Sequence, residues 1–141
     1  MRGRDTATGD PFGRDVRSWV DASRYDLETA RALLKTRRYL HVLFMCQQAL
    51  EKILKAHATV RTARFPPRIH DLVRLGELAD TVLSTEEREL LERLSLYYLQ
   101  TRYPPELKAL AKRVDRSMAA GHLERTEALW QRLRRQLARR R

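Results

Sequence analysis

Apolar residues recur at helical spacing along most of the chain. The clearest case is residues 40–58, where they follow the i, i+3, i+4, i+7 pattern of an amphipathic helix. The apolar positions there are Leu40, Leu43, Phe44, Leu50, Ile53, Leu54 and Ala58. A dense polar run is set into the same stretch: Gln47, Gln48, Glu51, Lys52 and Lys55. We predict that this helix, extending to about residue 60, is the centre of a helical bundle.

The same periodicity predicts the remaining elements. Helices are expected at residues 15–36, 70–79, 84–102 and 116–139, with a short helical turn at 106–114. Ser84 and Glu87 form a capping box at the start of one helix, and Asp115 is placed to cap the last one. The pairs Pro66-Pro67 and Pro104-Pro105 break the pattern, because the residue before a proline is pushed out of the helical conformation.

These elements predict an all-α fold, an up-and-down antiparallel bundle of four to five helices. The link of Arg37 and Arg38 is so short that the first two helices must be antiparallel neighbours. In the first helix Ser23 and Leu27 belong to the predicted buried stripe, and Asp26 lies outside it. We expect one domain over residues 14–141, after a flexible polar tail at 1–13.

The last helix carries a long, narrow apolar stripe. Its members recur at steps of three and four residues: Ala119, Leu123, Thr126, Trp130, Leu133 and Leu137. We take this stripe as one reason to expect a homodimer.

The chain is strongly basic, with a net charge of +11 and a pI near 10.6. Residues 105–141 carry 11 Lys and Arg against 4 Asp and Glu, so +7 of this charge lies at the C-terminal end. A basic surface favours a polyanionic partner such as RNA, or an acidic protein. A solvated, Arg-rich face is the alternative, and composition alone leaves the two open.

Several classes of protein are excluded. A single cysteine, Cys46, allows no internal disulfide and no multi-cysteine zinc site. His41, His57 and His122 show no metal-ligand spacing, and no glycine-rich phosphate loop is present, so we expect no metal and no cofactor. The N-terminus has no apolar signal segment, and no apolar run approaches the length of a membrane span. We expect a cytoplasmic protein with no membrane association.

Three segments in order carry a resemblance to a known family. They are QQALEKILKA at residues 47–56, HDL at 70–72 and RYP at 102–104. In this order and spacing they resemble the HEPN domain (higher eukaryotes and prokaryotes nucleotide-binding), over about residues 16–137. The resemblance implies a helical bundle that usually forms a homodimer. Members are often encoded beside a minimal nucleotidyltransferase in what look like toxin–antitoxin pairs. Some branches are metal-independent RNases, and others are thought to bind nucleotides without cutting RNA.

The RNase branches carry an arginine followed four to six residues later by a histidine. Arg64 and His70 have this separation here. The histidine would move a proton at the ribose 2′-OH or the leaving oxygen, and the arginine would stabilise the phosphorane charge. Two prolines intervene, and the pair comes earlier in the chain than in the nuclease branches. His70 is therefore open to two other interpretations: a capping residue of the helix that follows, or a phosphate contact.

The candidate nucleotide- or phosphate-binding residues are Gln48, Lys52, Lys55, His70, Arg102 and Tyr103. Gln48–Lys52 and Glu51–Lys55 are i, i+4 pairs, so the lysines are either phosphate ligands or members of ordinary helix pairs. Tyr97, Tyr98 and Tyr103 with Arg102 are either a base-stacking cluster or core aromatics with solvated hydroxyls.

The leading hypothesis is a HEPN-type nucleotide- or RNA-binding module that acts with a minimal nucleotidyltransferase in a toxin–antitoxin-like system. The alternatives are a metal-independent RNase toxin using Arg64 and His70, and a purely structural bundle.

Overall fold

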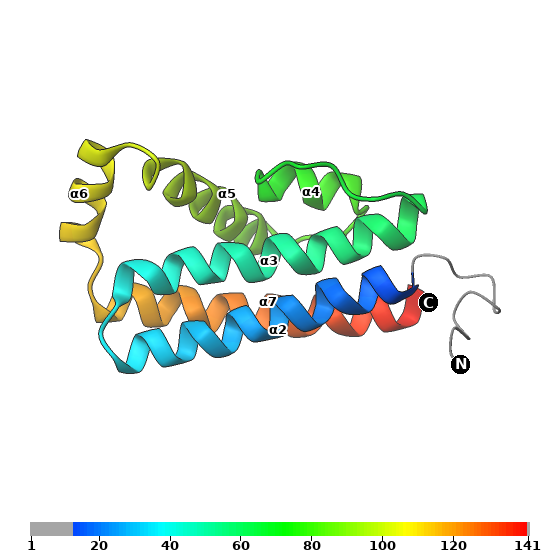
Figure 1. Ribbon diagram of the computed structural model, residues 1–141, viewed down its shortest axis with the longest axis horizontal. Coiled ribbons are helices and arrows are strands. Elements are labelled where there is room, and N and C mark those ends of the chain that lie inside the picture. Colours follow the sequence, from blue (N-terminus) through cyan, green and yellow to red (C-terminus); the bar gives the residue numbers. More distant parts are fainter. Residues whose placement is uncertain (1–12, 141) are drawn as a thin grey trace.

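A computed structural model of the chain describes residues 13–140. Six helices and no strand lie within them (Figure 1): α2 (Gly13–Lys35), α3 (Tyr39–Thr62), α4 (Leu72–Leu78), α5 (Thr85–Gln100), α6 (Pro104–Arg113) and α7 (Arg116–Arg140). The predicted all-α bundle is confirmed. The helical turn expected at residues 106–114 is a full helix, α6. The expected tail lies outside the described residues except for Gly13, which begins α2.

The central helix is α3, as predicted. Figure 1 shows α2 and α7 running along one side of it, and α4 and α5 on the other side. The apolar positions of α3 from Val42 to Ala58 are almost all buried, so α3 contributes to the core on both sides. α6 stands apart at one end of the molecule.

Capping residues set the ends of α5 and α7. The capping box of α5 is present: Ser84 Oγ accepts from the Glu87 amide at 3.0 Å, and the Glu87 carboxylate accepts from the Ser84 amide at 2.8 Å. Asp115 accepts from the Met118 amide at 2.9 Å and so caps α7. Arg132 of α7 also binds the Glu87 carboxylate through two nitrogens, at 2.9 and 2.8 Å. The start of α5 is therefore fixed to α7.

The apolar stripe of α7 is buried inside the single chain, and all six of its predicted members are inaccessible. Because the stripe is already covered by the bundle, it offers no surface for a second copy. The argument from this stripe to a homodimer was wrong for that reason.

Asp26 was expected to lie outside the buried stripe of the first helix, but it is buried. Its Oδ2 accepts from Lys52 Nζ at 2.7 Å, so α2 and α3 are joined by an ion pair at this level. A carboxylate can lie at such a position because the lysine on the neighbouring helix compensates its charge. Among residues 13–140, no helix is both long and apolar enough to cross a membrane.

Candidate functional site

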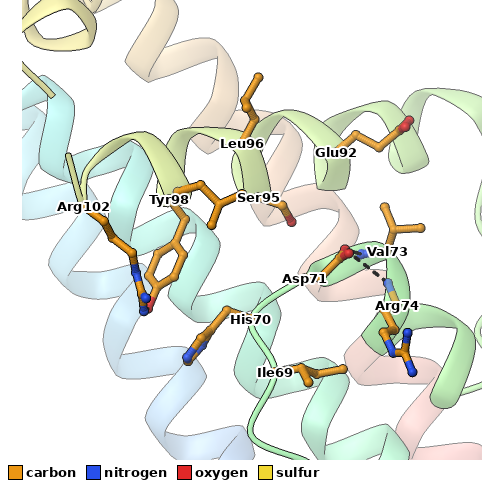
Figure 2. A pocket seen from close by; sticks show the side chains of 11 residues that line it. Ile69, His70, Asp71, Val73, Arg74, Glu92, Ser95, Leu96, Tyr98 and Arg102 are labelled. Atoms are coloured by element: carbon orange, nitrogen blue, oxygen red, sulfur yellow. Dashed lines mark hydrogen bonds between the residues drawn. The ribbon is translucent and has the colours of Figure 1, made fainter. Parts of the chain in front are cut away.

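A groove of about 790 Å³ lies between α4 and α5 (Figure 2). One wall comes from the segment before α4 and from α4 itself, with Ile69, His70, Val73 and Arg74. The other wall is one face of α5. Its residues recur at steps of three and four, as one helix face requires: Glu92, Ser95, Leu96, Leu99 and Arg102.

The start of α4 positions His70 at the edge of this groove. Asp71 is the N-cap residue, and its Oδ1 accepts from the amides of Val73 and Arg74 at 3.1 and 3.3 Å. Gln47 of α3 donates to the His70 carbonyl at 3.2 Å, which fixes the backbone just before the cap. The cap is therefore Asp71, and the interpretation of His70 as a capping residue was wrong.

Glu51 lies behind His70 on the central helix and is buried. Its Oε1 accepts from Gln47 Nε2 and from His70 Nδ1, each at 2.9 Å, and its Oε2 accepts from Lys55 Nζ at 3.0 Å. Burial alone raises the pKa of a carboxyl group, but these three hydrogen bonds outweigh it and lower the pKa of Glu51. Glu51 is thus a carboxylate at neutral pH.

This charge state decides the proton position on His70. An ionised carboxylate has no proton to donate, so His70 Nδ1 must carry the hydrogen in their 2.9 Å contact. The other ring nitrogen, Nε2, then points away from Glu51. The side chain is 42% exposed and lines the groove, so Nε2 is available to a ligand there.

Tyr98 and Arg102 of α5 complete this end of the groove (Figure 2). The Tyr98 ring lies against the His70 ring, with 5.1 Å between centroids, and stacks on Phe44 at 5.7 Å. The Arg102 guanidinium lies over the Tyr98 ring at 5.1 Å and donates to its hydroxyl at 3.1 Å. An imidazole and a guanidinium therefore meet around one aromatic ring, an arrangement suited to a phosphate next to a stacked base.

The polar residues of α3 serve this site from behind. Lys55 is buried between Glu51 and the Trp19 ring, whose centroid is 5.5 Å from Nζ. Gln48 donates to Gln47 at 2.7 Å. Lys52 pairs with Asp26 across to α2, so the expected Gln48–Lys52 pair is replaced by two other contacts. None of these three side chains lines the groove.

Two other predicted residues lie elsewhere. Arg64 lines a separate hollow of about 500 Å³ with Phe65, Pro67 and Leu78, on the far side of the proline segment from His70 along the chain. Tyr103 occupies the N-cap position of α6 and is 59% exposed, next to the groove residue Arg102. The structure brings His70 together with Arg102.

Several groove residues were missed from the sequence: Arg74, Glu92, Leu96 and Leu99. A signal was present for the last two. They lie on α5 outside its buried stripe of Leu90, Leu91 and Leu94, and both are more than half exposed. Exposed leucines one turn apart on a face already carrying an arginine indicate a surface with a binding role.

The remaining titratable core residues take no part in the groove. Burial raises the pKa of the Cys46 thiol to about 12, which makes it unreactive. Burial lowers the pKa of His57 to about 4, and it also lowers that of His122. Within residues 13–140 there is no cluster of three or more His, Cys, Asp or Glu side chains able to hold a metal.

Comparisons with known proteins agree with this architecture. A family model described as the HEPN domain matches residues 16–136. The chain belongs to the HEPN family. A solved HEPN-like helical structure, TT1696 from Thermus thermophilus, superposes with a TM-score of 0.71 at 26% sequence identity, over 85% of this chain and 96% of that one. A search of curated proteins finds no match. HEPN membership supports a nucleotide- or RNA-related module.

Proposed function

We propose that this HEPN protein binds a nucleotide, free or as part of RNA, in the groove between α4 and α5. The observation that carries the proposal is the meeting of His70, Tyr98 and Arg102 at one end of the groove. Arg102 supplies a planar cation for phosphate, and the apolar wall of Leu96 and Leu99 supplies a surface for a base.

Preorganisation of His70 supports the same assignment. The imidazole is held at Nδ1 by Glu51 and packed against Tyr98 before any ligand arrives. A ligand that accepts from or donates to Nε2 therefore avoids the entropic cost of ordering this side chain. A purely structural bundle has no need of a half-exposed histidine oriented by a buried carboxylate.

The test is calorimetric titration of ATP, GTP, CTP and UTP into wild type, Arg102→Gln and His70→Ala. We expect at least one nucleotide to bind, with an affinity about tenfold lower in Arg102→Gln, since a charged hydrogen bond contributes roughly 1.5–3 kcal/mol. Arg88→Gln is the matched control, because Arg88 is an exposed arginine of α5 outside the groove lining. Equal affinities in wild type, Arg102→Gln and His70→Ala would refute the groove as the binding site.

A second candidate function is metal-independent RNA cleavage. The observation that favours it is the Glu51–His70 pair, since a histidine oriented through Nδ1 by a carboxylate is suited to move a proton at Nε2. Arg102 is better situated than Arg64 to stabilise a phosphorane beside His70. Cleavage of labelled RNA in EDTA by wild type, with loss in His70→Ala and an end product carrying a 2′,3′-cyclic phosphate, would establish it; no cleavage by wild type would exclude it.

We further propose that the protein forms a homodimer and acts with a minimal nucleotidyltransferase in a toxin–antitoxin-like pair. The support for the nucleotidyltransferase is the family resemblance. The support for the dimer is an exposed apolar surface beside the groove, formed by Leu96, Leu99 and Tyr103. A neighbouring gene encoding a Gly-Ser motif with paired aspartates, and co-purification of its product with this chain, would support the pairing; a product that never co-purifies would count against it.

A further inference from the structure

A second hollow, of about 240 Å³, lies between α2 and α7, on the side of α3 away from the nucleotide groove (Figure 1). Its rim carries three arginines, Arg17 and Arg24 from α2 and Arg134 from α7. Its floor is apolar, from Val20, Leu137 and Ala138. We call Arg17, Arg24 and Arg134 the arginine rim.

Arg24 is held in place before any partner binds. Its guanidinium lies over the Trp130 ring at 5.6 Å, and Nη1 is 3.2 Å from Asp21 Oδ1. Trp130 is itself fixed, since its Nε1 donates to Ser23 Oγ at 2.8 Å. A guanidinium stacked on a buried indole presents its free edge to solvent in a fixed direction, which suits bidentate contact with a phosphate.

The positive charge around this rim is not needed to hold the fold. α7 carries seven arginines against two glutamates, a net charge of +5. Arg132 and Arg140 bind Glu87 and backbone carbonyls, so they are structural. Arg134 and Arg135 are exposed, and neither meets an acidic partner within residues 13–140. Like charges left unpaired on one helix repel each other, so a polyanion that approaches them is attracted.

We propose that the arginine rim is a second binding site, one that takes the phosphate backbone of single-stranded RNA. Arginine forks recognise phosphates, and an apolar floor between them provides a contact for an unstacked base. The inference rests on the nucleotide-related function proposed above only for the choice of RNA over an acidic protein. The site itself is separate, because α3 lies between it and the groove.

The experiment measures fluorescence anisotropy of a labelled single-stranded RNA of about 20 nucleotides between roughly 50 and 200 mM salt. The variants are Arg24→Gln/Arg134→Gln and Arg134→Gln alone. The single variant keeps the test free of folding effects, since Arg134 contacts no acidic residue of the described chain. Lys108→Gln/Lys112→Gln on α6 is the matched control, because it removes the same charge at the other end of the molecule.

We expect RNA affinity to fall about tenfold in the double variant, and the slope of log affinity against log salt to fall by about 1.4, since each phosphate contact on a single strand contributes about 0.7. The α6 control is expected to keep the wild-type slope. Equal losses in the rim variant and the control would overturn the inference, as they would reflect net charge alone. Binding of polyglutamate as strong as that of RNA would also overturn it, by assigning the rim to acidic proteins.

The two sites are distinguished by their probes. If the rim variants lose RNA but bind nucleoside triphosphates normally, the inference stands whether or not the groove variants change nucleotide affinity. If the groove variants lose nucleotide while the rim variants bind RNA normally, the groove stands and the inference fails.

Discussion

His70 Nδ1 lies 2.9 Å from Oε1 of Glu51, a carboxylate that is buried on the central helix. A half-exposed histidine on a connecting segment is thus oriented by a residue of the core. The same carboxylate holds Lys55 on its other oxygen, so the orientation of His70 depends on a network that reaches as far as Trp19. Damage to that network is expected to reach the groove without touching any groove residue.

Glu51→Gln tests this dependence. In wild type the carboxylate accepts only, so neutral His70 should be found as the Nδ1–H tautomer; the variant amide both donates and accepts, so a mixture of tautomers is expected. Long-range ¹H–¹⁵N NMR of the imidazole, at a pH where it is neutral, reports the tautomer directly. Glu86→Gln, an exposed first-turn residue of α5, is the control. A wild-type spectrum dominated by the Nε2–H tautomer would contradict the proton position derived from Glu51.

His57 predicts how stability depends on pH. Its Nε2 lies 2.7 Å from the Leu133 carbonyl in the core, and burial lowers its pKa from 6.5 to about 4. The unfolded chain therefore binds a proton at a higher pH than the folded chain does. Stability from this group is complete above about pH 6.5 and falls as the pH drops toward 4, by up to about 3 kcal/mol.

Urea denaturation of wild type and His57→Gln between these pH values measures the effect. The difference in free energy of unfolding between the two proteins should shrink as the pH falls, because the variant has no group to protonate there. His41→Gln, at an exposed position of α3, should leave the wild-type pH dependence unchanged. A His57→Gln profile parallel to that of wild type would refute the assignment.

Two arginines of α7 offer a matched pair for stability. Arg132 binds Glu87 through two nitrogens and also donates to the Val82 carbonyl at 2.8 Å. Arg132→Gln should cost about 1–2 kcal/mol, since it removes charged hydrogen bonds that fix the capping box of α5. Arg134→Gln, two residues on, should change stability by less than about 0.5 kcal/mol. Thermal denaturation of both variants makes the comparison, and equal midpoints would show that the Glu87 clamp contributes nothing.

The proposed homodimer has a direct test. Leu96 and Leu99 are 52% and 54% exposed beside the groove, although both are leucines. Leu96→Asp/Leu99→Asp should convert a dimer to a monomer, because a carboxylate buried at an interface without a partner costs several kcal/mol. Light scattering of both proteins at matched concentration measures the mass. A monomeric wild type removes the proposal, and a dimeric variant moves the interface away from α5.

The sequence by itself determined the helices and most of the core. Period 3.6 apolar spacing, the Ser84–Glu87 capping box, the Asp115 cap and the paired prolines are local signals, and each depends on residues within one or two turns. The resemblance of QQALEKILKA, HDL and RYP to the HEPN domain was likewise sufficient to identify the family. His70 and Arg102 were also named as candidate ligands from these segments.

Only the tertiary structure decided which polar residues face a ligand. By their spacing Lys52 and Lys55 are partners within one helix, but the neighbouring Asp26 and Trp19 of α2 bind them instead. Arg64 has the sequence separation of a nuclease motif, and the proline segment carries it to a different hollow from His70. Helical periodicity fixes the side on which a residue lies, whereas a site is made of side chains from different elements. Their convergence depends on how α3, α4 and α5 pack, and no short-range pattern records that.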